Sequence, residues 1–354
     1  MTRRSIRWFA AAALLSLVAA GCSAGSEGSS ENSGGNTAGD PEQIDITVTQ
    51  WPAGSYTPPY ALGREEGIFA DHGIEIEGVL PGAGGGTTVR NLLSGDLAFG
   101  EVAFPAAVQA FLSGAPLIIV GGAVRTFADG VYVTRADAEF EELPDLVGRK
   151  VGFTNPGSVT ETASFLLMEG AGIDHDQVEW TAAGGVAEGL TLLEAGELDA
   201  AFISEPQHTI EVNEGRWKTL FRMTEYVPAL QQTVIVTSPQ LIEENPELVE
   251  AYLAAYEESV QAVMSDPETA GRYWAAAGEF DEQASIDAVA DLAAVDHWSA
   301  VPDVDGMNAM LEGMITGGLL SESDEIAWDD LINQDFLPGG ATVDTTALML
   351  GASN

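Results

Sequence analysis

Four glycines fall within five positions of the stretch LPGAGGGTTVRNLLSGDLAFGE, residues 80–101. Backbone without side chains can approach a ligand closely. In a phosphate-binding P-loop that began at Gly82, four residues would be followed by glycine and lysine at 87 and 88, but Thr87 and Thr88 stand there. The dinucleotide fingerprint G-x-G-x-x-G also fails at Thr87. The stretch therefore predicts a wall of a binding cleft, with Thr87 capping the next helix or contacting the ligand.

Other motifs that could carry chemistry are incomplete. GCSAG at 21–25 matches the nucleophile elbow G-x-S-x-G, but it is not placed between a strand and a helix. Asp303, Asp305 and Glu312 have the spacing of a calcium loop, but Val301 replaces the first ligand and a helix start is expected there. The four histidines form no H-E-x-x-H motif. We therefore predict no catalytic residue, no metal and no cofactor.

The N-terminal segment, residues 1–21, is predicted to be a signal peptide. Three arginines precede the apolar run Trp8–Ala20, which is short for a membrane span. An arginine pair leaves export by the twin-arginine route open. VAAGC resembles a bacterial lipoprotein box, and we predict lipid attachment at Cys22, the only cysteine; ordinary secretion with a free thiol is the alternative. Residues 22–43 are rich in Gly, Ser and Asn and predict a flexible linker.

The chain is strongly acidic. It contains 55 Asp and Glu against 13 Lys and Arg, a formal net charge of −42. Nucleic-acid binding is excluded as a function because it requires clusters of basic residues. High external salt would screen the mutual repulsion of these charges, so we expect a halophilic source. A hydrophobic content of 45% argues against disorder.

Strand and helix patterns alternate from Ile44 onward. IDITVT and IEIEGVL have strand patterns, and TPPYALGREEGIFADHG begins with prolines and ends with glycine, as helices do. The order of glycine pair, helix, strand and glutamate occurs twice, ending at Glu101 and at Glu205. The pattern predicts two α/β lobes of similar construction, each with a mostly parallel sheet.

The lobes are predicted to be discontinuous in sequence. We assign 44–129 and 238–340 to lobe 1 and 130–237 to lobe 2. The β-like runs 130–134 and 233–237 bracket lobe 2 and are predicted to cross between the lobes as a pair.

These features resemble the substrate-binding lipoproteins of bacterial ABC importers, in the family for nitrate, aliphatic sulfonates, taurine and thiamine-precursor pyrimidines. The resemblance covers about 44–338 and includes PPYALGREEGIFADHGIEIE, DLVGRKVGFTNPGSVTETASFLLMEGAGI and LDAAFISEP. It implies a type II periplasmic-binding-protein fold, in which two α/β lobes are joined by two hinge crossings. It also implies a small-molecule ligand, a monomeric chain on the outer face of the membrane, and a permease and its ATPase as partners.

Ligand contacts are expected beyond the carboxyl ends of strands. In lobe 1 we predict contacts by the aromatic residues Trp51, Tyr56 and Tyr60, with packing of loop on lobe as the alternative. Glu101 lies among apolar residues, where a carboxylate requires a partner in the ligand or the protein. Arg125 could bind an anionic group or neutralise acidic surface.

In lobe 2, TNPGSVTE precedes a predicted helix whose first N–H groups favour anions or polar acceptors. We predict contacts by Asn155, Ser158 and Thr160, although Ser158 and Glu161 could use these donors in a capping box. Further predicted contacts, at the second glycine pair and the following strand end, are Gly185, Ser204 and Glu205, whereas His208 is expected to be a surface histidine.

The predicted contacts contain more carboxylates than cations. This balance favours a ligand that bears an amine, such as an aminopyrimidine. Two alternatives are a nitrate- or sulfonate-type anion and a pyrimidine-forming enzyme on the same fold, which would need Lys150 or Lys218 in the cleft. We predict that the protein is not an enzyme.

Overall fold

The computed structural model describes residues 41–95, 97–227 and 229–351, all of them in the unit Gly39–Asn354. The predicted signal peptide, Cys22 and all but the end of the predicted linker lie outside these residues.

Five strands form the first sheet, in the order β2–β1–β3–β10–β4. Their bounds are β1 Glu42–Thr49, β2 Ile74–Gly82, β3 Leu97–Ala103, β4 Ile118–Gly122 and β10 Thr233–Thr237. β1 is parallel to β2 and β3, whereas β10 runs antiparallel to β3 and β4. We call this sheet, with the helices packed on it, lobe 1.

Five more strands form the second sheet, in the order β7–β6–β8–β5–β9. Their bounds are β5 Gly130–Arg135, β6 Lys150–Phe153, β7 Glu179–Ala182, β8 Ala200–Ser204 and β9 Trp217–Arg222. β6 is parallel to β7 and β8, and β5 runs antiparallel to β8 and β9. This sheet and its helices form lobe 2. In both sheets the fourth strand of the order, β10 or β5, is the one that runs antiparallel to its neighbours, so the two lobes have the same sheet topology.

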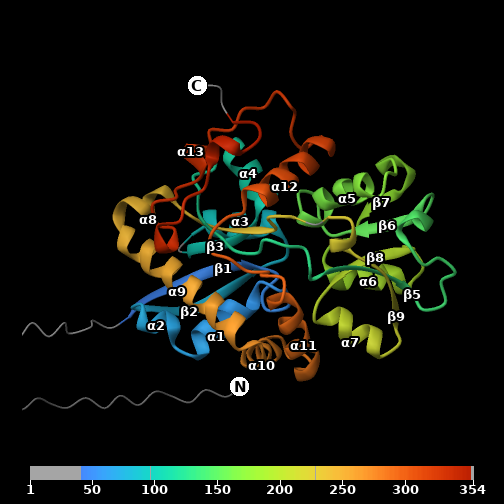
Figure 1. Ribbon diagram of the computed structural model, residues 1–354, viewed down its shortest axis with the longest axis horizontal. Coiled ribbons are helices and arrows are strands. Elements are labelled where there is room, and N and C mark those ends of the chain that lie inside the picture. The colour runs from blue at the N-terminus through green and yellow to red at the C-terminus, as the bar shows by residue number, and fades with distance from the viewer. Residues whose placement is uncertain (1–40, 96, 228, 352–354) are drawn as a thin grey trace, which may run out of the picture. The chain divides into compact units, whose positions relative to one another are not determined.

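Helices cover both faces of each sheet (Figure 1). The helices are α1 Thr57–Glu65, α2 Ile68–Asp71, α3 Gly85–Leu93, α4 Phe104–Leu112, α5 Val159–Gly170, α6 Val186–Glu194, α7 Gln207–Asn213, α8 Pro239–Glu244, α9 Pro246–Ser265, α10 Pro267–Gly278, α11 Glu282–Ala293, α12 Val304–Thr316 and α13 Trp328–Leu331. Short 3-10 helices are η1 Leu143–Leu146, η2 His175–Gln177, η3 Met223–Glu225, η4 Pro338–Gly340 and η5 Thr345–Ala347.

Local sequence explains where many of these helices begin. The side chains of Asn245, Asp266, Asp281 and Asp303 accept hydrogen bonds from free N–H groups at the starts of α9 to α12. The calcium-loop spacing at Asp303 is thus a helix cap. Proline occupies the first turn of α1, α4, α8, α9 and α10, where its missing N–H costs no hydrogen bond.

The alternation of side chains along each strand divides the core between the two faces. In lobe 1, Ile46 and Phe99 pack with α1 and α9, whereas Val102 and Val234 face α3 and α4. The apolar residues on the α3 and α4 face form a hydrophobic cluster that continues through α12 into α5 of lobe 2. Gly313 of α12 lies against α5, and a Cβ added there would be 2.9 Å from the backbone oxygen of Thr162, which is too close for a side chain.

The two runs predicted to cross between the lobes as a pair belong to different sheets. Residues 130–134 form β5 in the second sheet, and 233–237 form β10 in the first. Both runs are apolar and β-branched, which is a signal for buried strands rather than for connections. The connections themselves are 123–129, between β4 and β5, and 223–232, between β9 and β10. We call them the first and second crossings.

Candidate functional site

A small pocket lies where the strands of both lobes end. Lobe 1 supplies residues after β1, the glycine loop and the end of β3, and lobe 2 supplies residues after β6 and at the end of β8. Its lining consists of Thr49, Gln50, Tyr56, Gly84, Gly85, Ala103, Phe127, Asp129, Thr154, Ser158, Val159, Thr160, Phe202, Ser204 and Gln232. Carboxyl ends of strands are the usual binding position in open α/β folds.

The pocket has a volume of about 30 Å³. That is room for about two water molecules. An organic ligand is larger than this space, so it can bind only if the residues around the pocket rearrange.

Asp129 is the only carboxylate among the residues that line the pocket, and its side chain is 2% exposed. Its Oδ1 accepts a hydrogen bond of 2.7 Å from Gln232 Nε2, and its Oδ2 accepts one of 2.8 Å from Ser55 Oγ. Burial raises the pKa of Asp129 to about 6, although both hydrogen bonds oppose the rise. Each carboxylate oxygen keeps lone-pair capacity for a donor on a ligand.

Gln232 and Tyr56 form the next layer of this hydrogen-bond network. Tyr56 donates its hydroxyl to Gln232 Oε1 at 3.0 Å, and Gln232 Nε2 also donates to the carbonyl of Thr126 at 2.6 Å. Burial raises the pKa of Tyr56 well above its ordinary value, so the phenol remains a donor.

Ser55 is held from behind by a buried histidine. His297 Nε2 lies 3.2 Å from Ser55 Oγ, and its Nδ1 lies 2.6 Å from Thr126 Oγ1. Burial lowers the pKa of His297 to about 3, so the ring is neutral at neutral pH. Because Ser55 donates to Asp129, His297 donates to Ser55 and accepts from Thr126. A hydrolase triad needs the opposite arrangement, in which histidine takes the serine proton and the acid holds the histidine.

The lobe 2 wall is the start of α5. Ser158 Oγ accepts from the backbone N–H of Glu161 at 3.1 Å, and Glu161 Oε2 accepts from Gly157 N–H at 2.6 Å. Thr160 Oγ1 accepts from Thr154 N–H at 2.9 Å. Half of the capping box weighed from the sequence is therefore present: Ser158 caps the N–H of Glu161, but the carboxylate of Glu161 accepts from Gly157 instead of from Ser158. The Ser158 side chain thus uses one N–H donor of the helix start.

The glycine loop is part of the pocket wall. Gly84 and Gly85 line the pocket, and a Cβ on Gly85 would lie 2.5 Å from the Cβ of Ala103. Glycine is needed here because the start of α3 lies against Ala103 at the end of β3 and Ala106 in α4. Thr87 is not a lining residue, and its hydroxyl accepts a hydrogen bond from Arg90.

Four predicted contacts line the pocket, namely Tyr56, Ser158, Thr160 and Ser204. Asn155 does not line it, but its side chain faces Gly84 of lobe 1 and donates to the carbonyl of Gly184 at 3.3 Å. Gly185 precedes α6, beside Glu188.

Trp51, Tyr60 and Glu101 belong to the interior of lobe 1 rather than to the pocket lining. Trp51 and Tyr60 pack in the core cluster on the α1 and α9 face of the sheet. Glu101 is 1% exposed, and its Oε1 accepts a hydrogen bond of 2.7 Å from Thr233. Its Oε2 has no partner among the described residues. The carboxyl group contacts the protein instead of the pocket because it shares a strand face with Phe99.

Arg125 and Glu205 are paired within the protein. Arg125 donates to the carbonyl of Asp296 at 2.8 Å. Glu205 Oε1 lies 2.9 Å from His208 Nδ1 and 3.3 Å from Arg222 Nη2. Burial alone would raise the pKa of Glu205, but the hydrogen bond and charge of His208, with Thr209 and Arg222, outweigh it and lower the pKa. His208 is buried, contrary to the surface position expected from the sequence.

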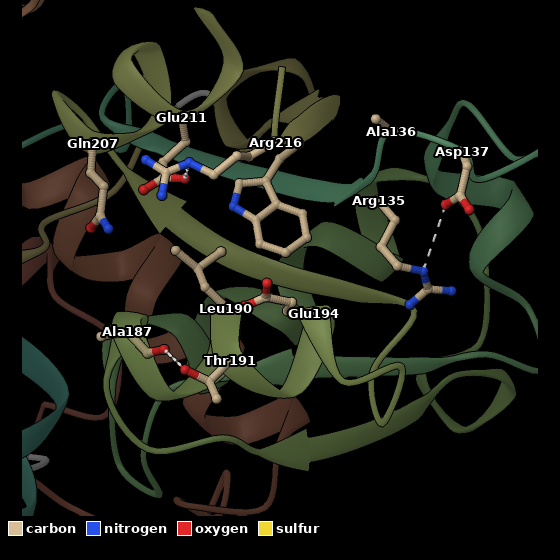
Figure 2. A pocket seen from close by; sticks show the side chains of 11 residues that line it. Arg135, Ala136, Asp137, Ala187, Leu190, Thr191, Glu194, Gln207, Glu211 and Arg216 are labelled. Atoms are coloured by element: carbon tan, nitrogen blue, oxygen red, sulfur yellow. Dashed lines mark hydrogen bonds and ion pairs between the residues drawn. The ribbon is translucent and has the colours of Figure 1, made fainter. Parts of the chain in front are cut away.

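A separate hollow of about 470 Å³ lies on lobe 2, between α6, α7, the end of β5 and the start of β9 (Figure 2). Its arginines are engaged: Arg216 Nε lies 2.7 Å from Glu211 Oε2, and Arg135 donates to the carbonyls of Leu193 and Leu198. The functional site is better placed between the lobes, where buried polar groups from both lobes converge.

In the described part of the chain, no group of His, Cys, Asp and Glu could hold a metal ion, and no helix meets the length and hydropathy of a membrane span.

Two five-stranded sheets with the antiparallel strand in the same place, in lobes joined by two crossings, define the type II periplasmic-binding-protein fold. Similar solved structures confirm this fold class. One is the alkanesulfonate-binding protein SsuA from Xanthomonas axonopodis pv. citri bound to MOPS, with 13% identity, a TM-score of 0.67 and coverage of 84% of this chain and 99% of that one. The aliphatic sulphonate-binding SsuA from Escherichia coli has 17% identity, a TM-score of 0.64 and coverages of 86% and 96%. The nitrate-binding protein NrtA from Synechocystis PCC 6803 has 16% identity, a TM-score of 0.59 and coverages of 70% and 70%.

The family model "NMT1/THI5 like" matches residues 55–270, which is more than half of the chain. The chain belongs to the NMT1/THI5-like family, which confirms the resemblance found in the sequence. No match was found among curated proteins.

Proposed function

We propose that this chain is the extracytoplasmic solute-binding component of an ABC importer. It captures a small organic molecule between its lobes and delivers it to a membrane permease and the ATPase of that permease. The family match, the two-lobed fold and a polar pocket between the lobes support this role. The lipoprotein-like sequence at Cys22 supports anchoring to the outer face of the cell membrane, and the chain acts as a monomer.

The ligand is a small molecule bearing an amine or a similar donor, such as an aminopyrimidine. One observation carries this proposal: the charged side chain in the pocket is the carboxylate of Asp129, and none of the described lining residues is Arg, Lys or His. Tyr56, Phe127 and Phe202 add aromatic walls that suit a planar ring.

An anion of the nitrate or sulfonate type is the second candidate, because NrtA and SsuA carry such names. The pocket opposes it. Asp129 would repel an anion, and the lining hydroxyls of Ser158 and Thr160 are already bonded to each other and to backbone N–H groups.

A pyrimidine-forming enzyme with a lysine-bound cofactor fits the geometry less well. Lys150 is the first residue of β6, and Lys218 is the second residue of β9. The pocket, in contrast, lies at the carboxyl ends of β6 and β8. The ammonium group of Lys218 donates to the carbonyl of Ala138 at 2.9 Å. Neither lysine lines the pocket.

Thermal unfolding with a small panel of probes tests the proposal. We expect 4-amino-2-methylpyrimidine to raise the melting temperature, and nitrate and methanesulfonate to leave it unchanged, at both low and high salt. A ligand at 100 times its Kd stabilises the folded state by about 2.7 kcal/mol, which corresponds to a rise of about 4 °C in melting temperature for a chain of this size.

Isothermal titration calorimetry at matched ionic strength provides the control for the anions, because added salt alone raises the melting temperature of an acidic chain without binding at the pocket. Saturable binding of either anion, without binding of any amine in the panel, would contradict the proposed ligand class. A spectral Schiff-base signal with added pyridoxal phosphate would instead support the enzyme.

A further inference from the structure

The two crossings lie side by side and are joined at Val124. Its carbonyl accepts hydrogen bonds from the backbone N–H groups of Gln232 at 2.8 Å and Thr233 at 3.3 Å. Its own N–H donates to Thr233 Oγ1 at 3.2 Å. Any change in the angle between the lobes must therefore be absorbed in these segments, since hinge motion is concentrated in a few connecting residues.

Two adjacent glutamines of the second crossing make different contacts. Gln231 is fully buried; its Nε2 donates to the carbonyls of Val124 and Thr233, and its Oε1 accepts from the N–H of Asp303 at the start of α12. Gln232 lines the pocket and holds Asp129. Gln231 therefore fixes the crossing to its surroundings, and Gln232 connects the crossing to the binding site.

The amide of Gln232 is fully used. Its two N–H donors bond Thr126 and Asp129 of the first crossing, and its oxygen accepts from Tyr56 of lobe 1. The carbonyl of Asp129 in turn accepts from the N–H of Glu205 at the end of β8, at 3.0 Å. A group bound to Asp129 thus sits where lobe 1, lobe 2 and both crossings meet.

We propose that Gln232 is a positioning residue that couples occupancy of the pocket to the separation of the lobes. Given the proposed function, it aims the Asp129 carboxylate at the ligand while the crossings are together. When the crossings move apart, the amide leaves Asp129, and the carboxylate loses the bond that directs it. A ligand held by Asp129 therefore favours the closed arrangement.

The surroundings of Asp129 allow this coupling to be measured. The titratable groups near it are Tyr56 after β1, Glu205 at the end of β8 and His297, which reaches it through Ser55. Loss of the Gln232 donor removes a bond that favours the charged carboxylate. The titration midpoint of Asp129 therefore reports whether the amide is in place.

The test compares Gln232→Met with Gln231→Met, a matched change at the neighbouring residue, in the mature chain without ligand. Carbon-13 NMR of the Asp129 carboxyl follows its titration, and X-ray scattering follows the radius of gyration. We expect Gln232→Met to raise the midpoint by about one pH unit and to increase the radius of gyration. Gln231→Met should leave the midpoint at the wild-type value.

Both measurements are made on the ligand-free protein, so they remain valid if 4-amino-2-methylpyrimidine does not bind and the proposed ligand class fails. If the probe does bind, Gln232→Met should weaken its affinity at least tenfold. A wild-type midpoint and radius of gyration in Gln232→Met, or an equal change in both variants, would overturn the coupling. Should Gln232→Met unfold, Gln232→Asn keeps the amide but shortens it, and the same shifts are expected.

Discussion

Replacing Asp129 by asparagine is expected to weaken binding of an amine-bearing ligand at least 100-fold. The substitution keeps the size of the side chain but removes the negative charge in a buried pocket whose described lining has no other carboxylate. Truncating one partner of a buried charged hydrogen bond typically costs 2–5 kcal/mol. A 100-fold loss is about 2.8 kcal/mol and lies within that range. Isothermal titration with 4-amino-2-methylpyrimidine measures the change.

Asp137→Asn is the matched control for this loss. Asp137 belongs to lobe 2, and its side chain is 89% exposed beside Arg135 (Figure 2). It removes the same charge from the chain without touching the pocket, so binding should stay within a factor of two or so. If Asp129→Asn also binds the probe with near wild-type affinity, Asp129 is not the group that recognises the ligand.

Replacing Glu101 by glutamine is expected to stabilise the protein at neutral and alkaline pH. Burial raises the pKa of Glu101 from 4.5 to about 8, against the opposing hydrogen bond from Thr233. The folded state thus holds a proton that the unfolded state releases. The contribution of Glu101 to stability is greatest below pH 4.5, falls as the pH rises to 8, and is then constant.

The magnitude follows from about 1.4 kcal/mol for each pH unit in that interval. At pH 7 the wild-type chain should have lost about 3 kcal/mol relative to acidic conditions, a loss that the neutral amide does not suffer. Urea unfolding of both proteins at pH 5, 6.5 and 8 measures the difference. Glu75→Gln, at an exposed position on β2, is the control. A difference in unfolding free energy that is the same at all three pH values would contradict this assignment.

The order of elements could be predicted from the sequence because each lobe has strong local signals. Strands such as Ile44–Val48 alternate, and helices begin at proline or at a capping side chain. The place of β5 and β10 in the sheets could not be predicted in the same way. Their apolar runs identify buried strands, but strand pairing depends on contacts between distant parts of the chain.

The lining of the pocket was predictable where it lies at the end of a strand or the start of a helix. Ser158, Thr160 and Ser204 were proposed by that rule and line the pocket, and their contact with a ligand stays a prediction. Asp129 and Gln232 were missed because they belong to the crossings, whose sequences have no periodicity that shows which way a side chain faces. An acid directly before a buried strand, as in FADGVYV, was the available signal.

Glu101 shows that a position near the end of a strand does not by itself predict a ligand contact, because the alternation of side chains decides which face of the sheet the residue occupies. Phe99 and Glu101 are two residues apart and therefore share one face of β3. Phe99 stacks on Tyr252 of α9 with ring centroids 3.8 Å apart, so the glutamate faces the same helical layer. The alternation of the strand, together with the position of the aromatic residue, was sufficient to direct the acid away from the cleft.

The position of β10 constrains the order in which the chain can fold. This strand lies between β3 and β4, yet it is synthesised after the whole of lobe 2. Until residue 237 has emerged, β3 and β4 cannot be joined, and each presents an unpaired edge that favours intermolecular aggregation. The earliest-made portion is thus the last to be completed, and a chain terminated before β10 would leave an N-terminal half that cannot close its own sheet.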